Sequence, residues 1–322
     1  MALGPRPELA DASRRAAARG LTLVELLVAM AIGMVIVAGL SAVFVNSSTA
    51  RNEIELSADV IENGQYAVVA LSRDLAQTGF YGTLVSPAGS TIDPCSTDPA
   101  VWAASLAVYA VGLNNADADP ACLARKPGTD AIFVQRASTC TTTEGGAGCA
   151  EEAGHAYLQV SECGMEYSAI SYVVARGLDA TLALQTKACD GTRAPKRRLV
   201  RRIYYINTSN VLSSVDVTPS GVLPPVALVE NIEQMQIEYA VDVDGDGTPD
   251  AFSPTPADWT LVIGARLWLL ARSATTSRNG SAALTFQMSD TRFDVPEATL
   301  NFKRRVYSTY VAFLTPKSRR ES

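Results

Sequence analysis

Four aspartates lie within the nine residues that run from Asp242 to Asp250. The segment reads D-x-D-x-D-G-x-x-D, so the carboxylates take positions 1, 3, 5 and 9, with Gly247 at position 6 for a sharp turn. Four carboxylates this close repel one another without a cation, and Ca²⁺ prefers such oxygen ligands. The spacing therefore predicts a structural Ca²⁺ site, whose ligands would be Asp242, Asp244, Asp246, the Thr248 carbonyl and Asp250.

This loop differs from the calcium loop of an EF-hand in two ways. Its position 12 is Ser253 rather than a bidentate Glu, and the preceding segment, Gln236–Val241, has a strand pattern rather than a helical one. It is closer to the calcium loops of extracellular β-proteins. The alternative is an acidic turn without metal, because Asp and Gly are common turn residues.

A second carboxylate in an unusual place is Glu25, the one charged residue in the 25-residue apolar run Leu21–Val45. At about 1.5 Å of rise per residue, such a helix crosses the roughly 30 Å hydrocarbon core of a bilayer. A carboxylate inside that core costs about 2.5–3.5 kcal/mol on insertion scales. Glu25 is therefore predicted to have a functional partner.

The 20 residues before this run end at Gly20 and carry a charge of +2, from Arg6, Arg14, Arg15 and Arg19 against Glu8 and Asp11. A net-positive leader, a terminal Gly, an apolar helix and Glu at its fifth position together resemble the type IV prepilin class III signal. The resemblance implies that a membrane peptidase cuts between Gly20 and Leu21 and methylates the new amino terminus. It also implies that Glu25 neutralises the amine of a neighbouring subunit. The alternative is an ordinary signal anchor that happens to contain a Glu.

The charge distribution predicts orientation and compartment. Positive charge before the helix and a polar bulk after it predict a single pass with the C-terminal part exported. The whole chain of 322 residues has a net charge of −6, which leaves about −8 (−6 minus +2) after the leader. This acidity argues against a nucleic-acid-coating protein but does not exclude a local basic patch.

All six cysteines lie in the exported part, where an even number predicts disulfides. Six cysteines allow fifteen connectivities, and our working prediction is sequential pairing. The pairs would be Cys95–Cys122, Cys140–Cys149 and Cys163–Cys189. A metal site is the alternative, but the chain contains no C-x-x-C and a single histidine, His155.

After Val45 the helix is expected to continue to a C-cap at Gly79, with one apolar stripe facing a sheet. That stripe comprises Leu56, Val60, Gly64, Ala67, Leu71 and Leu75, and we expect Asn63-Gly64 to weaken or bend the helix. β-like runs follow at Ala131–Arg136, Ala156–Val160, Ala169–Ala175, Thr181–Gln185, Leu199–Ile206, Val226–Val241, Thr260–Arg272 and Arg305–Leu314. A long helix followed by many strands predicts an α+β fold.

Several segments resemble PilW-type minor pilins of type IV pili. These are Ile61–Phe80, Leu228–Tyr239, Trp259, Ala265–Ser273 and Arg304–Ala312. The resemblance covers residues 14–80 and roughly 199–314, and it does not reach the Cys-rich stretch 83–198. It implies a type IV pilin-like fold, in which a long N-terminal helix packs on an antiparallel β-sheet domain that carries a Cys-rich loop insertion.

On this basis we divide the chain into five parts. They are a leader (1–20), a transmembrane and polymerisation helix (21–45), its amphipathic continuation (46–80), a loop-rich disulfide-stapled insertion with strands (81–198) and a C-terminal β-region with the Asp-rich loop (199–322).

The expected function is that of a minor pilin in pilus assembly initiation or a tip complex. The expected partners are prepilin peptidase, other minor and major pilins, the inner-membrane assembly machinery and the membrane. The protein would be held in the inner membrane of a Gram-negative bacterium, with a periplasmic C-terminal domain, and then enter the pilus. A minor pseudopilin of type II secretion is one alternative, and a membrane-anchored exported binding protein that never polymerises is another.

Two further features bear on nucleic-acid binding and catalysis. The basic cluster Lys196, Arg197, Arg198, Arg201 and Arg202 is interpreted as the solvated edge of a strand, with phosphate binding by charge as the alternative. No G-x-S-x-G, H-E-x-x-H or P-loop motif occurs, so the chain is not expected to be an enzyme.

Overall fold

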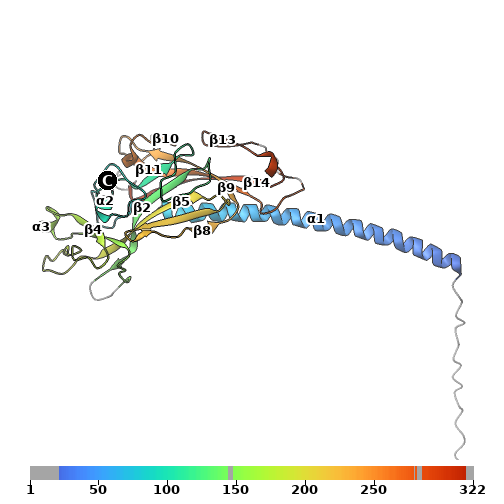
Figure 1. Cartoon of the computed structure of the whole chain (residues 1–322), viewed down its shortest axis with the longest axis horizontal. Helices are drawn as coiled ribbons and strands as arrows, with labels where there is room; N and C mark the ends of the chain where they lie inside the picture. Colours follow the sequence, from blue (N-terminus) through green and yellow to red (C-terminus); the bar gives the residue numbers. More distant parts are fainter. Residues whose placement is uncertain (1–21, 144–147, 279, 281–284, 317–322) are drawn as a thin grey trace, which may run out of the picture. The chain divides into compact units, whose positions relative to one another are not determined.

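Residues Leu23–Leu75 form one continuous helix of 53 residues, α1, and no proline interrupts it (Figure 1). The computed structural model describes residues 22–143, 148–278, 280 and 285–316. The predicted cleavage residues Gly20 and Leu21 lie outside this range. Two compact units divide between Asn52 and Glu53, so α1 begins in the first unit and ends in the second.

The second half of α1 packs on the β-structure through the predicted stripe. Its buried residues are Leu56, Val60, Gly64, Ala67, Leu71, Asp74 and Leu75. Four of them, Val60, Ala67, Leu71 and Leu75, join a core with Ile237, Leu267 and other strand residues. Full burial of a Leu or Val side chain contributes about 1.5–3 kcal/mol, so this stripe fixes the helix on the sheet. The helix ends at Leu75, and a turn follows to Gly79, whose φ of 76° only glycine adopts readily.

α1 continues through Gly64, and this glycine lets a strand come close to the helix. A Cβ atom on Gly64 would lie 2.1 Å from Cε2 of Tyr307, so no larger residue fits beside this ring. The Tyr307 hydroxyl donates to the Val60 carbonyl at 3.2 Å. The glycine therefore serves packing, a role that the sequence did not reveal, and the predicted weakening of the helix at this point stays a prediction.

The chain after α1 is mainly β-structure. The helices are α2 (Pro99–Ala103) and α3 (Gly164–Tyr167), and short 3-10 turns lie at Trp259–Leu261 and Glu297–Thr299. The first strands are β1 (Ala110–Leu113), β2 (Ala131–Thr142), β3 (Ala156–Val160), β4 (Tyr172–Arg176), β5 (Lys196–Ile206), β6 (Leu212–Thr218) and β7 (Gly221–Val222). The others are β8 (Val226–Val229), β9 (Ile232–Val241), β10 (Ala251–Ser253), β11 (Val262–Arg272), β12 (Thr285–Met288), β13 (Thr291–Asp294) and β14 (Arg304–Ala312).

The strands pair antiparallel in three sheets (Figure 1). The largest has the order β1-β2-β5-β3-β4, with β6 beside the second half of β5 and with β7 and β8 beside β6. The second has the order β10-β9-β11-β14, and β12 and β13 form a separate hairpin. The α+β class and the helix-on-antiparallel-sheet arrangement predicted from the sequence are thus confirmed.

Two predicted strands differ from the structure. Thr181–Gln185 forms a single bridge, between Gln185 and Arg193, instead of a strand. Its apolar pattern reflects the burial of Leu182 and Leu184 in a loop. The run Val226–Val241 is broken between β8 and β9, because Asn231 adopts a φ of 61°, a conformation that Asn tolerates better than most residues.

Three disulfides staple the segment that follows α1, with the sequential pairing predicted. They join Cys95 to Cys122, Cys140 to Cys149 and Cys163 to Cys189, with Cα–Cα distances of 5.6, 6.0 and 5.2 Å. The first bridge links the loop before α2 to the loop before β2, so it covers a region with little regular structure. Removal of such a bridge typically costs about 2–5 kcal/mol.

Asp130 joins the two larger sheets. Its N–H donates to the Met235 carbonyl at 2.9 Å, and its Oδ2 accepts from the Ile237 N–H at 2.7 Å. The carboxyl is 3% exposed, and burial raises its pKa from the ordinary 3.8 to about 7. The Ile237 N–H, the Asn115 N–H and Arg125 oppose this shift, whereas Asp290 adds to it.

This burial predicts a pH-dependent stability. Between pH 3.8 and about 7 the folded protein keeps a proton on Asp130 that the unfolded chain releases. The stability that depends on this proton is therefore fully present below pH 3.8 and is lost as the pH rises to about 7. The loss is on the order of 4 kcal/mol at about 1.4 kcal/mol per pH unit. Denaturant unfolding from pH 4.5 to 7.5 measures this loss. We expect the free energy of unfolding of Asp130→Asn to fall less with rising pH than that of the wild type. Parallel wild-type and variant curves would show that Asp130 does not titrate in this window.

Candidate functional site

Glu25 caps the N-terminus of α1. The Thr22 N–H donates to Glu25 Oε2 at 2.9 Å, and the Thr22 hydroxyl donates to the same oxygen at 3.0 Å. In return the Glu25 N–H donates to the Thr22 hydroxyl oxygen at 3.2 Å. This reciprocal pattern is a capping box, which satisfies N–H groups that no helical carbonyl reaches. The T-x-x-E spacing of Thr22 and Glu25 was readable in the sequence, but the prediction assigned Glu25 an intermolecular role alone.

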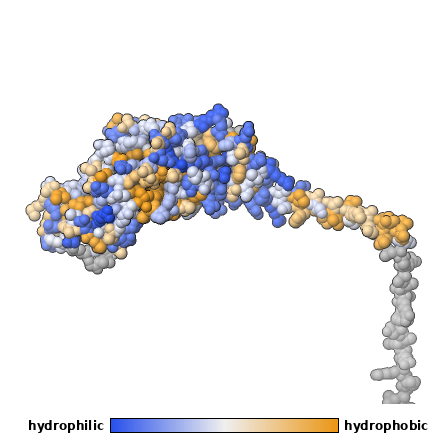
Figure 2. All heavy atoms as spheres, viewed as in Figure 1, coloured by the Kyte–Doolittle hydropathy of each residue, from blue (hydrophilic) through white to orange (hydrophobic). Residues whose placement is uncertain are grey.

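The first part of α1 is an exposed apolar rod. Large apolar residues such as Leu23, Val35 and Phe44 are 73–74% exposed, and Figure 2 shows this part of the helix as mostly apolar. Among the described residues, α1 is the helix long and apolar enough to cross a membrane. Such a surface needs lipid or other apolar helices around it. Gly33 and Gly39 have no heavy atom within 4 Å of an added Cβ, so both offer room for a close helix neighbour.

The aspartate loop joins β9 to β10. One carboxylate oxygen from each of Asp242, Asp244 and Asp250 lies within 4.8 Å of the other two. Asp242 is buried, and its two oxygens accept from the N–H groups of Gly245 and Gly247 at 2.8 and 3.0 Å. Both glycines have a positive φ, 81° and 83°, as the predicted sharp turn requires.

Asp246 does not join this group in the structure. The Asp246 carboxylate accepts from the Thr248 N–H at 2.7 Å and from the Thr248 hydroxyl at 2.6 Å, which lowers the pKa of Asp246. Three of the four predicted aspartate ligands are therefore brought together, and the fourth faces its neighbour.

The C-terminal end of α1 carries a buried ionic network that the sequence did not reveal. Asp74 Oδ1 accepts from Arg136 Nε at 2.7 Å, and Asp74 Oδ2 accepts from the Tyr204 hydroxyl at 2.6 Å and from Arg202 at 3.4 Å. Arg202 also pairs with Asp216 on β6, at 2.8 Å. Burial and the nearby Asp74 raise the pKa of Tyr204. One helix residue thus binds strands β2 and β5 together.

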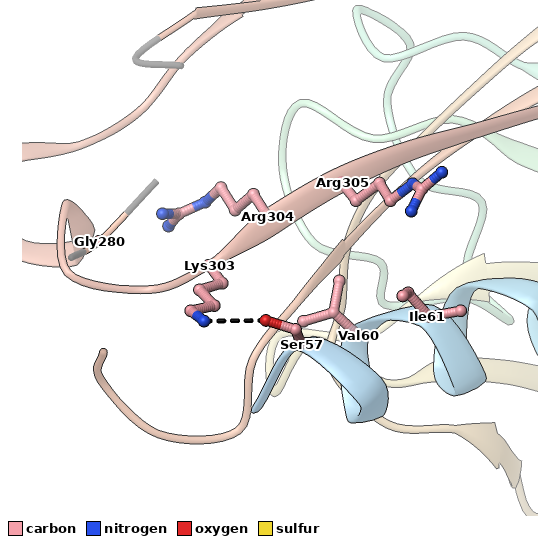
Figure 3. A pocket seen from close by; sticks show the side chains of 7 residues that line it. All are labelled: Ser57, Val60, Ile61, Gly280, Lys303, Arg304 and Arg305. Atoms are coloured by element: carbon pink, nitrogen blue, oxygen red, sulfur yellow. Dashed lines mark hydrogen bonds between the residues drawn. The ribbon is translucent and has the colours of Figure 1, made fainter. Parts of the chain in front are cut away.

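A second ionic contact anchors α1 near the start of the second unit. The Lys303 ammonium donates to the Ser57 hydroxyl at 2.8 Å (Figure 3) and pairs with Glu53 Oε2 at 2.8 Å. Glu53 also accepts from the Ser277 hydroxyl at 2.6 Å and from the Arg278 N–H at 3.0 Å. With Lys303 as the largest cause, these partners lower the pKa of Glu53 to about 2.

The basic cluster of β5 is internal, so the predicted solvated strand edge was wrong. β5 pairs with β2 on one side and with β3 and β6 on the other. Arg201 is 1% exposed and lies 4.7 and 4.8 Å from the ring centres of Trp102 and Phe133. Its guanidinium donates to the carbonyls of Ser96 and Asp93, which ties the first disulfide loop to the sheet.

The other basic residues of this strand also have internal partners. Lys196 pairs with Glu151 at 2.6 Å, Arg202 joins the Asp74 network, and Arg197 donates to the carbonyls of Ser138 and Thr139. Four of the five side chains of the cluster therefore hold the fold together, whereas phosphate binding would require them to be free.

Comparison with known proteins gives two family matches. Residues 15–41 match the family described as the prokaryotic N-terminal methylation motif, and residues 198–313 match the family described as Type IV Pilus-assembly protein W. Both resemblances drawn from the sequence are confirmed, although the segment Ile61–Phe80, which also carried the second one, lies outside the two matches. Most of the Cys-rich stretch 83–198 lies outside the two matches, as expected.

The comparisons with solved structures and with curated proteins give less information than the family matches. A type IV-like pilin from Thermus thermophilus is 14% identical and superposes with a TM-score of 0.32, covering 82% of this chain and 98% of that chain. At this score the superposition carries no argument. No curated protein matches the sequence.

Proposed function

Because the chain is PilW-like and begins with a prepilin methylation motif, we propose that it is a minor pilin that acts in initiation or at the tip of a type IV pilus. A prepilin peptidase would cut after Gly20 and methylate Leu21, and the protein would wait in the inner membrane with its β-domain in the periplasm. It would then assemble with other minor and major pilins through the pilus machinery.

One observation carries this proposal: an exposed apolar rod ends in a capped Glu25 at the position where the methylation motif lies. A plain membrane anchor has no need for a carboxylate at this place, where insertion costs about 2.5–3.5 kcal/mol. A helix that leaves the lipid to pack against other helices gains from small residues and from a charge partner.

Processing tests the proposal directly. In cells that contain a prepilin peptidase, the protein is expected to lose residues 1–20, and mass spectrometry should find N-methyl-Leu21 at the new amino terminus. Gly20→Val should leave the full chain uncut, since the signal that this segment resembles has a leader that ends in Gly. A normal cut in this variant, or an intact wild-type leader, would instead favour a membrane-anchored protein that does not polymerise.

We also propose that the aspartate loop binds Ca²⁺ in a structural role. Its support is the cluster of Asp242, Asp244 and Asp250 oxygens within 4.8 Å at the β9–β10 turn. Three carboxylates whose oxygens lie this close together suit a hard cation such as Ca²⁺. Asp246 would complete the predicted set by turning away from Thr248.

The calcium proposal predicts a ligand-dependent melting temperature. For the fragment from Glu53 onward, Ca²⁺ at a hundredfold excess over Kd should add about 2.7 kcal/mol of stability by mass action. Asp244→Ala should abolish the gain but cost little without Ca²⁺, because Asp244 is exposed and its carboxylate accepts one long bond, from the Asp246 N–H at 3.2 Å. Glu297→Ala, another exposed acid, is the control and should keep the gain. Equal wild-type melting curves in Ca²⁺ and in chelator would identify an acidic turn.

A further inference from the structure

Arg198 is the fifth residue of the basic cluster on β5, and it is the one whose side chain has no hydrogen bond or ion pair within the described part of the chain. It lies directly opposite Tyr157 of β3. Residues that face each other on antiparallel strands have their side chains on the same side of the sheet. On the other side of β5, the pairing with β2 shifts register between Ala137 and Thr141. The charge of Arg198 is therefore available at an irregular part of the sheet.

Arg198 lines a cavity of about 250 Å³. Tyr157, Glu152 and the Cys140–Cys149 disulfide also belong to its lining. The disulfide joins two parts of the wall covalently, so the oxidised protein holds this part of the lining together. Pockets for drug-sized ligands measure about 300–1,000 Å³, so a smaller molecule suits this cavity.

The same cavity contains a negative charge that does not neutralise Arg198. The Glu152 N–H donates to the Tyr157 hydroxyl at 2.9 Å, and Glu152 Oε2 lies 2.9 Å from His155 Nε2. Glu152 Oε1 has no partner among the described residues, and within them no ion pair joins Glu152 to Arg198. A cation and an anion thus line one cavity without meeting. A ligand that carries both charges would complete this arrangement.

Both charges act on the Tyr157 hydroxyl. Burial is the largest cause that raises the pKa of Tyr157, and the hydrogen bond from the Glu152 N–H opposes it. The negative charges of Glu152 and Glu151 raise this pKa further, whereas the positive charge of Arg198 lowers it. Glu151 already pairs with Lys196 at 2.6 Å. Glu152 and Arg198 are therefore the charges near this hydroxyl that a bound molecule can meet.

We propose that this cavity binds a small zwitterion with the chemistry of a free α-amino acid. The Arg198 guanidinium would bind the carboxylate of the ligand, since a planar guanidinium donates two parallel hydrogen bonds to a carboxylate. Glu152 would accept from the ammonium group, and the Tyr157 hydroxyl lies near both charges. A molecule with a single charge leaves one of the two side chains without a partner, so it should bind more weakly.

The site belongs to the part of the chain that the family matches do not describe. Arg198 is the first residue of the second match, and the other residues named in the lining lie between the two matched segments. The proposal is independent of pilus assembly, so either one can fail without the other.

Isothermal titration calorimetry on the full chain, purified in detergent, tests the proposal with L-alanine as the probe. Acetate and methylammonium each carry one of its two charges and serve as matched probes. L-Alanine is expected to bind at least tenfold more tightly than either of them. Arg198→Gln and Glu152→Gln should each weaken the binding of L-alanine at least tenfold, because each variant removes one charged contact.

Control variants separate the cavity from charge in general. Arg305→Gln and Glu297→Gln remove the same charges from exposed residues elsewhere and should bind like the wild type. Arg198→Lys keeps the charge without the planar fork, so its affinity should fall between those of the wild type and Arg198→Gln. If L-alanine gives no saturable heat, or if correctly folded Arg198→Gln and Glu152→Gln bind it like the wild type, the proposal is wrong. Equal affinities for acetate and L-alanine would also overturn it, because they would leave Glu152 without a role.

Discussion

Asp74→Ala is expected to destabilise the fragment from Glu53 onward by about 3–5 kcal/mol, the usual cost of removing one partner from a buried ion pair. The side chain of Asp74 is 10% exposed, and its loss leaves Arg136, itself 15% exposed, without a counter-ion in the described network. Tyr204 loses its hydroxyl acceptor at the same time. Denaturant unfolding should show a lower midpoint with an unchanged slope.

Two variants separate the charge of Asp74 from its shape. Asp74→Asn keeps an oxygen that accepts from Arg136 or Tyr204, so it should cost less than Asp74→Ala while still removing the negative charge. Asp216→Ala removes the more exposed partner of Arg202 (31% exposed) and should cost no more than about 1 kcal/mol, as for surface pairs. If Asp74→Ala and Asp216→Ala cost the same, burial does not set the strength of this network.

The sequence predicted the features that depend on local periodicity. The buried face of α1 was predicted because apolar residues recur every three or four positions, and that pattern indicates which face of a helix packs on a core. The sequential cysteine pairs were a working prediction among fifteen connectivities, and the structure contains these pairs.

Features that depend on contacts between distant residues were missed. Asp74 looked like one more polar residue near a helix end, and its role is visible only once Arg136 and Tyr204 are known to face it. Gly64 looked like a weak point because Tyr307, its neighbour, lies 243 positions later in the chain. Lys196 to Arg202 looked like a solvated edge because the sequence does not show that β5 has strands on both sides.

The aspartate loop is an intermediate case. Its turn chemistry was predictable, since Gly245 and Gly247 adopt the positive φ that the motif requires. The sequence also implied that all four aspartates point inward, whereas Asp246 bonds to Thr248. An Asp followed two positions later by Thr offers a local hydrogen bond that competes with a shared site, and this competition is part of the physics of turns.

Glu25→Ala is expected to keep the protein in the membrane and to remove it from pili. Removing the carboxylate makes insertion of the apolar helix easier, by about 2.5–3.5 kcal/mol on insertion scales, so the variant should accumulate as a cleaved membrane protein. Assembly should fail because the amine of a neighbouring subunit loses its counter-charge. Immunoblots of sheared pili and of membranes, with cleavage checked in both fractions, measure the two effects.

Glu25 has a possible role in capping α1 and another in pairing with the amine of a neighbouring subunit. Glu25→Ala by itself does not separate these two roles, since it removes the helix cap together with the charge. Loss of a cap costs about 0.5–2 kcal/mol and would act on the monomer. Glu25→Gln keeps an oxygen that can accept from Thr22 but is neutral, whereas Thr22→Val removes the hydroxyl that bonds to Glu25 and keeps the charge. If an intermolecular amine is the partner, Glu25→Gln should be absent from pili as Glu25→Ala is, and Thr22→Val should assemble. The opposite outcome, with Glu25→Gln assembled and Thr22→Val absent, would make the cap itself the function of Glu25 and would remove the charge contact from the assembly mechanism.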